Sequence, residues 1–166
     1  NGTPFGSNEF VASTIVTSPL LGEIGKGYGL GVRTTLTGFK HIAAVIAQES
    51  GSRDFVVGAE ESYGYLIKNT ARDKDAVSAC CVISELAHTL NEKGMTILER
   101  LEEIHRKFGL YQEGLVSIVK TGRNGAKEIE DIITSFRTNP PESLAGNKVV
   151  TIVLSFFTKI KPCCAT

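Results

Sequence analysis

The sequence has no tryptophan, a single methionine and no net charge, because 18 lysines and arginines balance 18 aspartates and glutamates. Without a positive field around the whole chain, we expect no nucleic-acid partner. No uninterrupted apolar run reaches the roughly 18 to 20 residues that a membrane helix needs. The first residues, NGTPFGSNEF, also lack the basic region and apolar core of a signal peptide. We therefore expect no membrane partner.

The cysteines and histidines lack the spacing of a metal site. The four cysteines form two adjacent pairs, Cys80-Cys81 and Cys163-Cys164, without a C-x-x-C arrangement. Neighbouring cysteines seldom bridge each other, so we expect reduced, buried thiols and a cytoplasmic location. The sequence predicts no metal ligands in this chain.

What the chain does contain is an alternation of apolar strands and helical patterns. Its 166 residues, 42% hydrophobic and 22% charged, suit one globular domain or one domain with part of another. Strands are expected near residues 10–17, 30–36 and 54–59, with a helix in each interval. Such alternation predicts a sheet covered by helices and joined by right-handed crossovers. The predicted fold class is α/β: a three-layer α/β/α unit with a mixed, mostly parallel sheet, followed by the beginning of a smaller α+β domain.

Two helical patterns follow this alternation. Residues 75–90 carry apolar residues over a broad surface, which predicts a helix largely buried against the sheet. Residues 96–108 form an amphipathic pattern. A boundary then falls between domains of residues 1–112 and 113–166, since the character of the sequence changes. The second part is expected to hold an extended strand over 112–120, a helix over 126–137 and a strand over 148–153.

The polar stretch 56–76, VVGAEESYGYLIKNTARDKDA, holds the candidate binding residues. Glu60 and Ser62 are two residues apart, so in an extended segment they project to the same side. A carboxylate and a hydroxyl together suit a polyol such as a sugar. Arg72 and Lys74 precede the next helix, where cations beside free helix N–H groups attract phosphate. The alternative is that these are solvated loop acids and an ordinary charged helix start.

Five segments in the same order resemble the phosphohexomutase family, the phosphoglucomutases and phosphomannomutases. They are TIVTSPLL (14–21), TLTGFKHI (35–42), VGAEESYGYL (57–66), RDKDAVSAC (72–80) and TNPPESLAG (138–146). The resemblance is to the family's third domain and the start of its fourth. It implies that residues 1–112 are a third domain lacking its first strand and helix. Residues 113–166 are then a linker and a partial start of the C-terminal domain.

The resemblance also implies an activity and residue roles. Phosphohexomutases move a phosphoryl group between the 1- and 6-oxygens of a hexose, with a phosphoserine on the first domain and Mg²⁺ on the second. Carried over, Glu60 and Ser62 contact the sugar hydroxyls and set sugar specificity. Lys40, in the T-G-F-K turn, is a candidate catalytic residue for proton transfer or phosphate contact. Arg72 and Lys74 match the basic pair that follows the sugar loop.

The chain departs from the family where the other loops are expected. It has no T-A-S-H-N-P serine loop, no D-G-D-x-D-R metal loop and no R-x-S-G-T-E phosphate loop. We therefore expect a fragment that is inactive alone, with Mg²⁺ held elsewhere in the intact enzyme. Its substrate is then a hexose phosphate and its partners are the remaining domains of the parent enzyme. The alternative is a stand-alone, non-catalytic sugar-phosphate-binding or interaction module.

Overall fold

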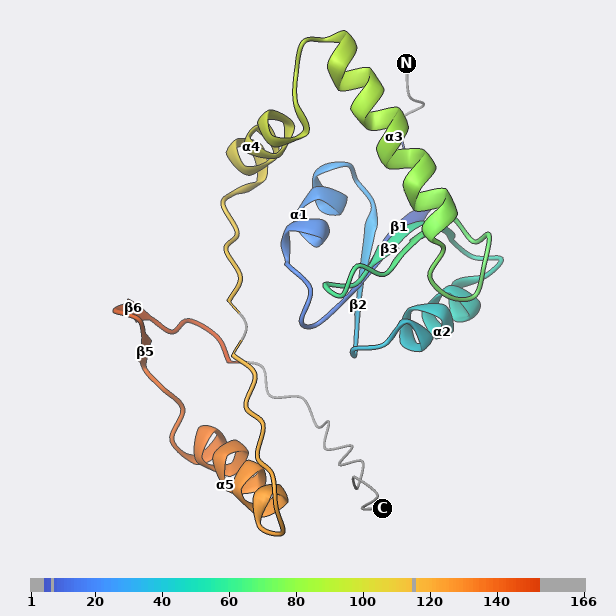
Figure 1. The fold of residues 1–166 in the computed structure, drawn as a ribbon. Helices are drawn as coiled ribbons and strands as arrows, with labels where there is room; N and C mark the ends of the chain where they lie inside the picture. The colour runs from blue at the N-terminus through green and yellow to red at the C-terminus, as the bar shows by residue number, and fades with distance from the viewer. Residues whose placement is uncertain (1–4, 7, 115, 153–166) are drawn as a thin grey trace. The chain divides into compact units, whose positions relative to one another are not determined.

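The computed structural model describes residues 5, 6, 8–114 and 116–152. The chain divides into two compact units, residues 1–113 and 114–166. Each unit has its own sheet, one of four strands and one of two (Figure 1).

The first unit contains four strands and four helices. In chain order they are β1 (Glu9–Thr14), α1 (Leu20–Gly27), β2 (Gly31–Thr35), α2 (Phe39–Glu49), β3 (Asp54–Ala59), β4 (Tyr65–Ile67), α3 (Ala76–Glu92) and α4 (Ile97–Phe108). The sheet order is β2-β1-β3-β4, in which β1 pairs in parallel with β2 and β3 while β4 pairs antiparallel with β3. The predicted α/β class with a mixed, mostly parallel sheet is confirmed. The first strand ends earlier than predicted because Thr17 N–H donates to the Thr14 carbonyl and turns the chain.

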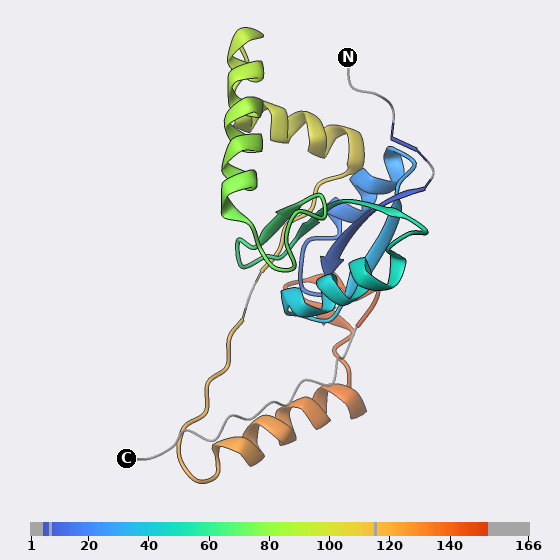
Figure 2. The ribbon, with the colours of Figure 1, turned by 90° about the vertical axis from the view of Figure 1, so that its right-hand side faces the viewer.

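Helices α1 and α2 cover opposite faces of this sheet (Figures 1 and 2). Phe10 and Ala12 of β1 belong to the buried cluster that α2 supplies with Phe39, Ile42 and Ile46. Val11 points to the other face, since side chains alternate along a strand. There α1 approaches so closely that a Cβ added at Gly25 would lie 2.7 Å from Val11 Cγ2. Helix α4 contacts α1 on its outer side. The result is the predicted three-layer arrangement.

The loops that carry most of the candidate site residues lie at one edge of the sheet. The parallel strands β1, β2 and β3 all end there, and β4 begins there because it is antiparallel to β3, with Ala59 opposite Tyr65. We call it the carboxyl edge. Helix α2 also begins on this side, directly after β2. In open α/β sheets this edge is where ligands bind.

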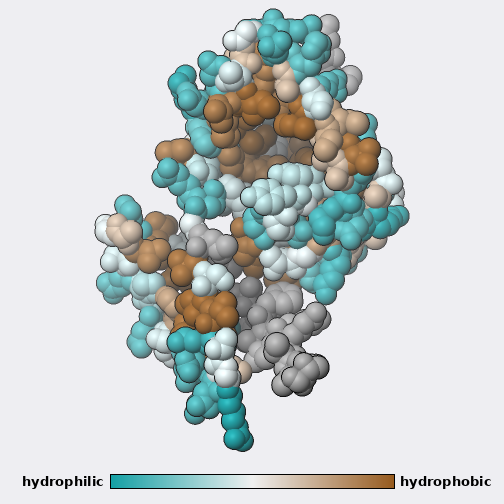
Figure 3. All heavy atoms as spheres, in the orientation of Figure 1, coloured by the Kyte–Doolittle hydropathy of each residue, from teal (hydrophilic) through white to brown (hydrophobic). Residues whose placement is uncertain are grey.

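Helix α3 is mostly exposed, so the prediction that it is largely buried against the sheet is wrong. Of its described residues only Leu90 is buried, and Val77 is 75% exposed. The exposed large hydrophobic residues of α3 and α4 are Val77, Val82, Ile83, Leu86, Ile97, Leu98 and Leu101. The physical reason is that this 17-residue helix meets the sheet at the edge strand β4, which is three residues long and covers little of it. Figure 3 shows hydrophobic side chains gathered around a hollow over α3 and α4.

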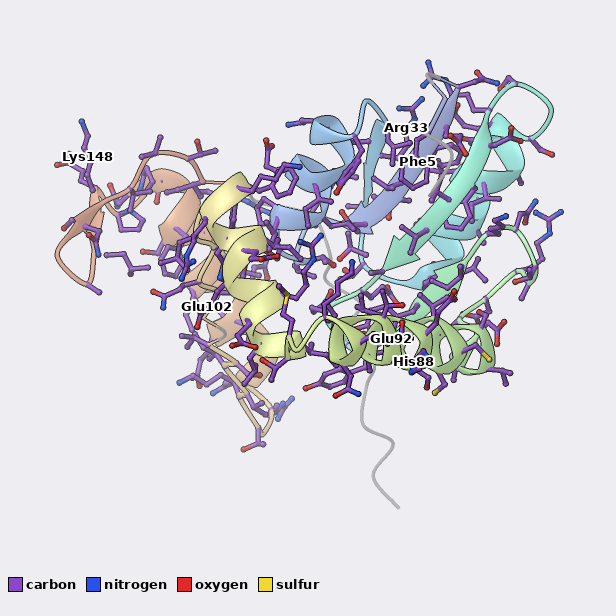
Figure 4. All side chains as sticks on the ribbon, turned by 90° about the horizontal axis from the view of Figure 1, so that it is seen from above. Phe5, Arg33, His88, Glu92, Glu102 and Lys148 are labelled. Carbon is purple, nitrogen blue, oxygen red and sulfur yellow. The ribbon has the colours of Figure 1, made fainter. Side chains whose placement is uncertain are left out.

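The two sides of α3 differ in chemistry. His88 and Glu92 lie one turn apart on the polar side (Figure 4), with 3.6 Å between His88 Nε2 and Glu92 Oε1. Cys80 and Cys81 are both free and exposed, so the prediction of buried thiols is wrong for this pair. The reason is again the small area of sheet beside the helix. Cys163 and Cys164 lie outside the described residues.

The second unit contains α5 (Gly125–Thr138) and a hairpin of β5 (Ser143–Leu144) and β6 (Asn147–Lys148). Ala145 and Gly146 both have positive φ, 47° and 81°, as a two-residue hairpin turn requires. The strand predicted over 112–120 does not form in the described residues of that range, because an extended segment becomes a strand only by pairing. The strand predicted over 148–153 is wrong for the described residues 149–152, because β6 ends at Lys148; Val153 lies outside the described residues. None of the described helices is long and apolar enough to cross a membrane.

We expect buried and exposed positions of the first unit to respond differently to truncation. Leu66 of β4 is fully buried, so Leu66→Ala lowers the free energy of unfolding by about 2 to 5 kcal/mol. Val77→Ala on the exposed face of α3 changes it by less than about 0.5 kcal/mol. Urea unfolding followed by circular dichroism measures both. A large loss for Val77→Ala would contradict the exposed position of α3.

Candidate functional site

Residues 60–64 connect β3 and β4 as a tight hairpin at the carboxyl edge. The Glu60 N–H donates to the Gly64 carbonyl at 2.9 Å, and Tyr63 has a φ of 63°. The prediction of an extended segment at Glu60 and Ser62 is therefore wrong, because the chain reverses there to form β4. Two residues of separation do not place Glu60 and Ser62 on one side of a turn. Ser62 is exposed near the tip of the hairpin.

The carboxylate of Glu60 ties this hairpin to the start of α2. Glu60 is 7% exposed, and its Oε1 accepts from Gly38 N–H at 2.8 Å. Gly38 has a φ of 109°, which a side chain would strain, and it directly precedes α2. Lys40 lies exposed in the first turn of that helix. The structure thus brings Lys40 and Glu60 to the same edge.

Glu61 links the hairpin to the end of β1 and the turn that follows it. Its Oε2 accepts from Thr14 Oγ1 at 3.2 Å and from Thr17 Oγ1 at 3.1 Å. The two hydroxyls also lie 2.8 Å from each other. Sequence reasoning assigned no such role to these threonines. The available signal was their position at the end of the buried run of β1 and in the turn that follows it.

Lys74 reaches back across the hairpin from the segment before α3. Its Nζ lies 5.7 Å from the centroid of the Phe39 ring and 3.4 Å from Asp73 Oδ1. The backbone holds this segment in place, because Asp75 N–H donates to the Tyr65 carbonyl at 2.7 Å. Lys74 therefore joins Glu60 at the carboxyl edge.

Arg72 occupies a different environment from Lys74. Its Nη1 lies 3.4 Å from Asn69 Oδ1 within its own loop, and the residue is exposed. The structure shows no contact between Arg72 and the hairpin among the described hydrogen bonds and ion pairs. The basic pair expected from the sequence is thus divided between two neighbourhoods.

The N-terminus of α3 is already capped, which corrects the expectation of free N–H groups beside Lys74. Asp75 Oδ1 accepts from Val77 N–H at 3.0 Å and from Ser78 N–H at 3.4 Å. Hydrogen bonds from Ser78, and then from Val77, lower the pKa of the Asp75 carboxyl. A carboxylate at this position takes the place that an anion would otherwise occupy.

An apolar groove of about 500 Å³ runs from the hairpin along α3. It begins at Tyr63 and Lys74 and follows β4 and one face of α3 as far as Leu86. Apart from the lysine, its walls are mainly tyrosine rings and aliphatic side chains. Within the described part of the chain, no three His, Cys, Asp or Glu side chains come together as metal ligands do. The site offers cations, hydroxyls and one buried carboxylate.

Comparison with known proteins identifies the family of this domain. The family model for the α/β/α domain III of phosphoglucomutase/phosphomannomutase matches residues 3–108. Phosphoglucomutase of Staphylococcus haemolyticus is 36% identical over 144 residues, which cover 84% of this chain and 26% of that protein. For Staphylococcus aureus (strain N315) phosphoglucomutase the identity is 36% over 145 residues, covering 87% and 26%.

A solved structure agrees with this result at the level of the fold. The open form of pp63/parafusin, a phosphoglucomutase from Paramecium, superposes with a TM-score of 0.56 and 21% identity. The match covers 78% of this chain and 22% of that one.

The sheet order, the helices on both of its faces and the superposed structure therefore define an α/β/α domain. The chain belongs to the phosphoglucomutase/phosphomannomutase family, and residues 3–108 match its domain III. The chain spans about a quarter of the length of the curated relatives it matches.

The Asp75 cap gives a pH-dependent prediction. Because the folded-state pKa of Asp75 is lowered, its stabilising contribution is present above the unfolded pKa of about 3.9 and is lost as pH falls through the folded value. Asp75→Asn keeps a good capping side chain without a charge. The difference in melting temperature between the natural protein and Asp75→Asn should be largest near neutral pH and shrink below about pH 4. A difference that stays constant with pH would contradict the charged cap.

Proposed function

We propose that this chain carries the sugar-specificity loop of a phosphoglucomutase/phosphomannomutase-type enzyme. In the intact enzyme the reaction is an intramolecular phosphoryl transfer on a hexose phosphate. The observation that carries the proposal is that Glu60 and Lys74 lie together beside Gly64 at the carboxyl edge of a domain of this family, with Lys40 in the first turn of α2 and Ser62 in the hairpin.

The chemistry of these side chains suits a hexose phosphate. Ser62 is exposed, and a hydroxyl both donates to and accepts from a sugar hydroxyl. A carboxylate has about four acceptor positions, and Gly38 N–H uses one of those on Glu60, so acceptor capacity remains for a sugar hydroxyl. We assign Lys40 and Lys74 to the phosphate, and Lys40 is also the candidate for proton transfer. Arg72 would join them at the phosphate if its loop closed over a ligand.

The remaining catalytic parts are proposed to lie outside this chain. Phosphoryl transfer depends on positioning and on stabilisation of charge. In this family the resemblance assigns those tasks to a phosphoserine, to Mg²⁺ and to a phosphate loop whose motifs are missing from this sequence. We therefore infer that the chain alone is inactive and that no step uses a metal held by it.

The partners that we propose are the remaining domains of the parent enzyme. Support comes from the fraction of the curated relatives that this chain spans, 26%, and from the exposed hydrophobic residues of α3 and α4. A contiguous apolar surface of this kind favours burial against another part of a protein. A cytoplasmic location stays a prediction from the spacing of the cysteines.

A binding and turnover experiment tests the proposed function. With glucose 1-phosphate, a hexose bisphosphate activator and Mg²⁺, we expect no turnover in a coupled assay. A few exposed hydrogen bonds, each worth about 0.5 to 1.5 kcal/mol, predict glucose 6-phosphate binding no tighter than about 1 mM. Lys74→Met should weaken this binding several-fold, whereas Lys93→Met, at the far end of α3, serves as the matched control and should leave it unchanged.

Two results would contradict the proposal in different ways. Sustained turnover by the purified chain would show that the catalytic parts are present after all. Micromolar binding that is lost in Glu60→Ala or Ser62→Ala, without turnover, would favour the stand-alone binding module.

A further inference from the structure

Gly64, the last residue of the hairpin, is buried where the side chains of Glu60 and Lys74 meet. A Cβ built on Gly64 would lie 3.1 Å from Glu60 Oε2 and 3.0 Å from Lys74 Cγ, and closer still to Lys74 Cδ. Its φ lies outside the left-handed region, so an alanine could adopt this backbone. What the position requires is therefore space and not conformational freedom.

We propose that Gly64 is a positioning residue that sets the place of the Lys74 ammonium group. Without a side chain at residue 64, the stem of Lys74 crosses the hairpin and carries Nζ to the face of the Phe39 ring, 5.7 Å from its centroid. The ammonium group then stands between the start of α2 and the hairpin. The inference rests on the proposed function for what this cation binds, namely the phosphate of a hexose phosphate.

The backbone around Gly64 is held on both sides, so the side chains must respond to an added methyl group. The Gly64 carbonyl accepts from Glu60 N–H, and the carbonyl of the next residue, Tyr65, accepts from Asp75 N–H. Glu60 is itself fixed through Gly38 N–H. Lys74 is half exposed and has a flexible stem, so it is the group that can move. A β-carbon at residue 64 thus displaces Lys74 from Phe39.

Four variants test this inference: Gly64→Ala, Lys74→Ala, the two combined, and Gly114→Ala as a matched control. Gly114 has nothing within 4 Å of an added Cβ and no positive φ. In the natural chain, the Phe39 ring should shift the NMR signals of the Lys74 methylene protons next to the ammonium group upfield of those of the other lysines. We expect Gly64→Ala to lose this shift and Gly114→Ala to keep it. A shift retained in Gly64→Ala would overturn the proposal.

The double variant provides a second measurement that does not depend on a ligand. If the added methyl group meets Lys74, then Gly64→Ala lowers the melting temperature, and adding Lys74→Ala restores part of the loss. Should Gly64→Ala fail to fold, the double variant decides the matter: folding supports the proposal, and failure to fold overturns it.

Binding of glucose 6-phosphate separates this inference from the proposed function. Gly64→Ala should weaken binding by about as much as Lys74→Ala, and the double variant by no more than either. If Gly64→Ala loses the upfield shift that the Phe39 ring causes in the Lys74 methylene signals, but binding is unchanged, the positioning role is supported and the proposed function is contradicted. If Gly64→Ala loses binding but the shift of the Lys74 methylene signals is unchanged, the positioning role alone is overturned.

Discussion

A buried carboxylate, that of Glu60, joins the hairpin of residues 60–64 to the start of α2. Burial of a charge is costly unless it is hydrogen-bonded. The bond from Gly38 N–H to Glu60 Oε1 meets that requirement and fixes the two segments to each other. Because Lys40 follows Gly38 and Lys74 packs across the hairpin, the positions of both cations depend on the same link. Loss of the acceptor would remove this link, while the Glu60 N–H to Gly64 carbonyl bond and the bonds that Glu61 accepts would still hold the hairpin.

Glu61 completes the attachment on the other side through Thr14 and Thr17. Adjacent acids thus hold the hairpin to the turns after β1 and β2. The exposed groups that remain at the tip, above all Ser62, are presented by a loop that is fixed at both sides. This arrangement suits recognition, since a fixed loop loses less conformational entropy when a ligand binds.

The sequence predicts those features that depend on local pattern. The strand over 54–59 and the helices α2 and α4 follow from apolar periodicity, and the common edge of Lys40 and Glu60 follows from the rule for parallel strands. Strand β4 is not predicted, because three residues give no usable period. The exposure of α3 is also not predictable from its own apolar residues, since it depends on how much sheet lies beside the helix.

The contacts that determine the candidate site are non-local, which is why sequence patterns do not reveal them. The bonds that Glu61 accepts from Thr14 and Thr17 join residues 47 and 44 positions apart. The burial of Glu60 depends on Gly38, 22 residues earlier. The Asp75 cap follows a familiar local pattern, and it could have been predicted from an aspartate directly before the helix.

The most direct test of this account maps where a hexose phosphate binds. Backbone amide shifts of the isotopically labelled chain are followed by NMR during a titration with glucose 6-phosphate, with inorganic phosphate and glucose as separate titrants. We expect shifts that saturate in the millimolar range or above and concentrate at Gly38, Lys40, residues 60–64 and Lys74. Shifts concentrated at the opposite edge of the sheet, around Arg53 and Lys68, or no saturable shift at all, would contradict it.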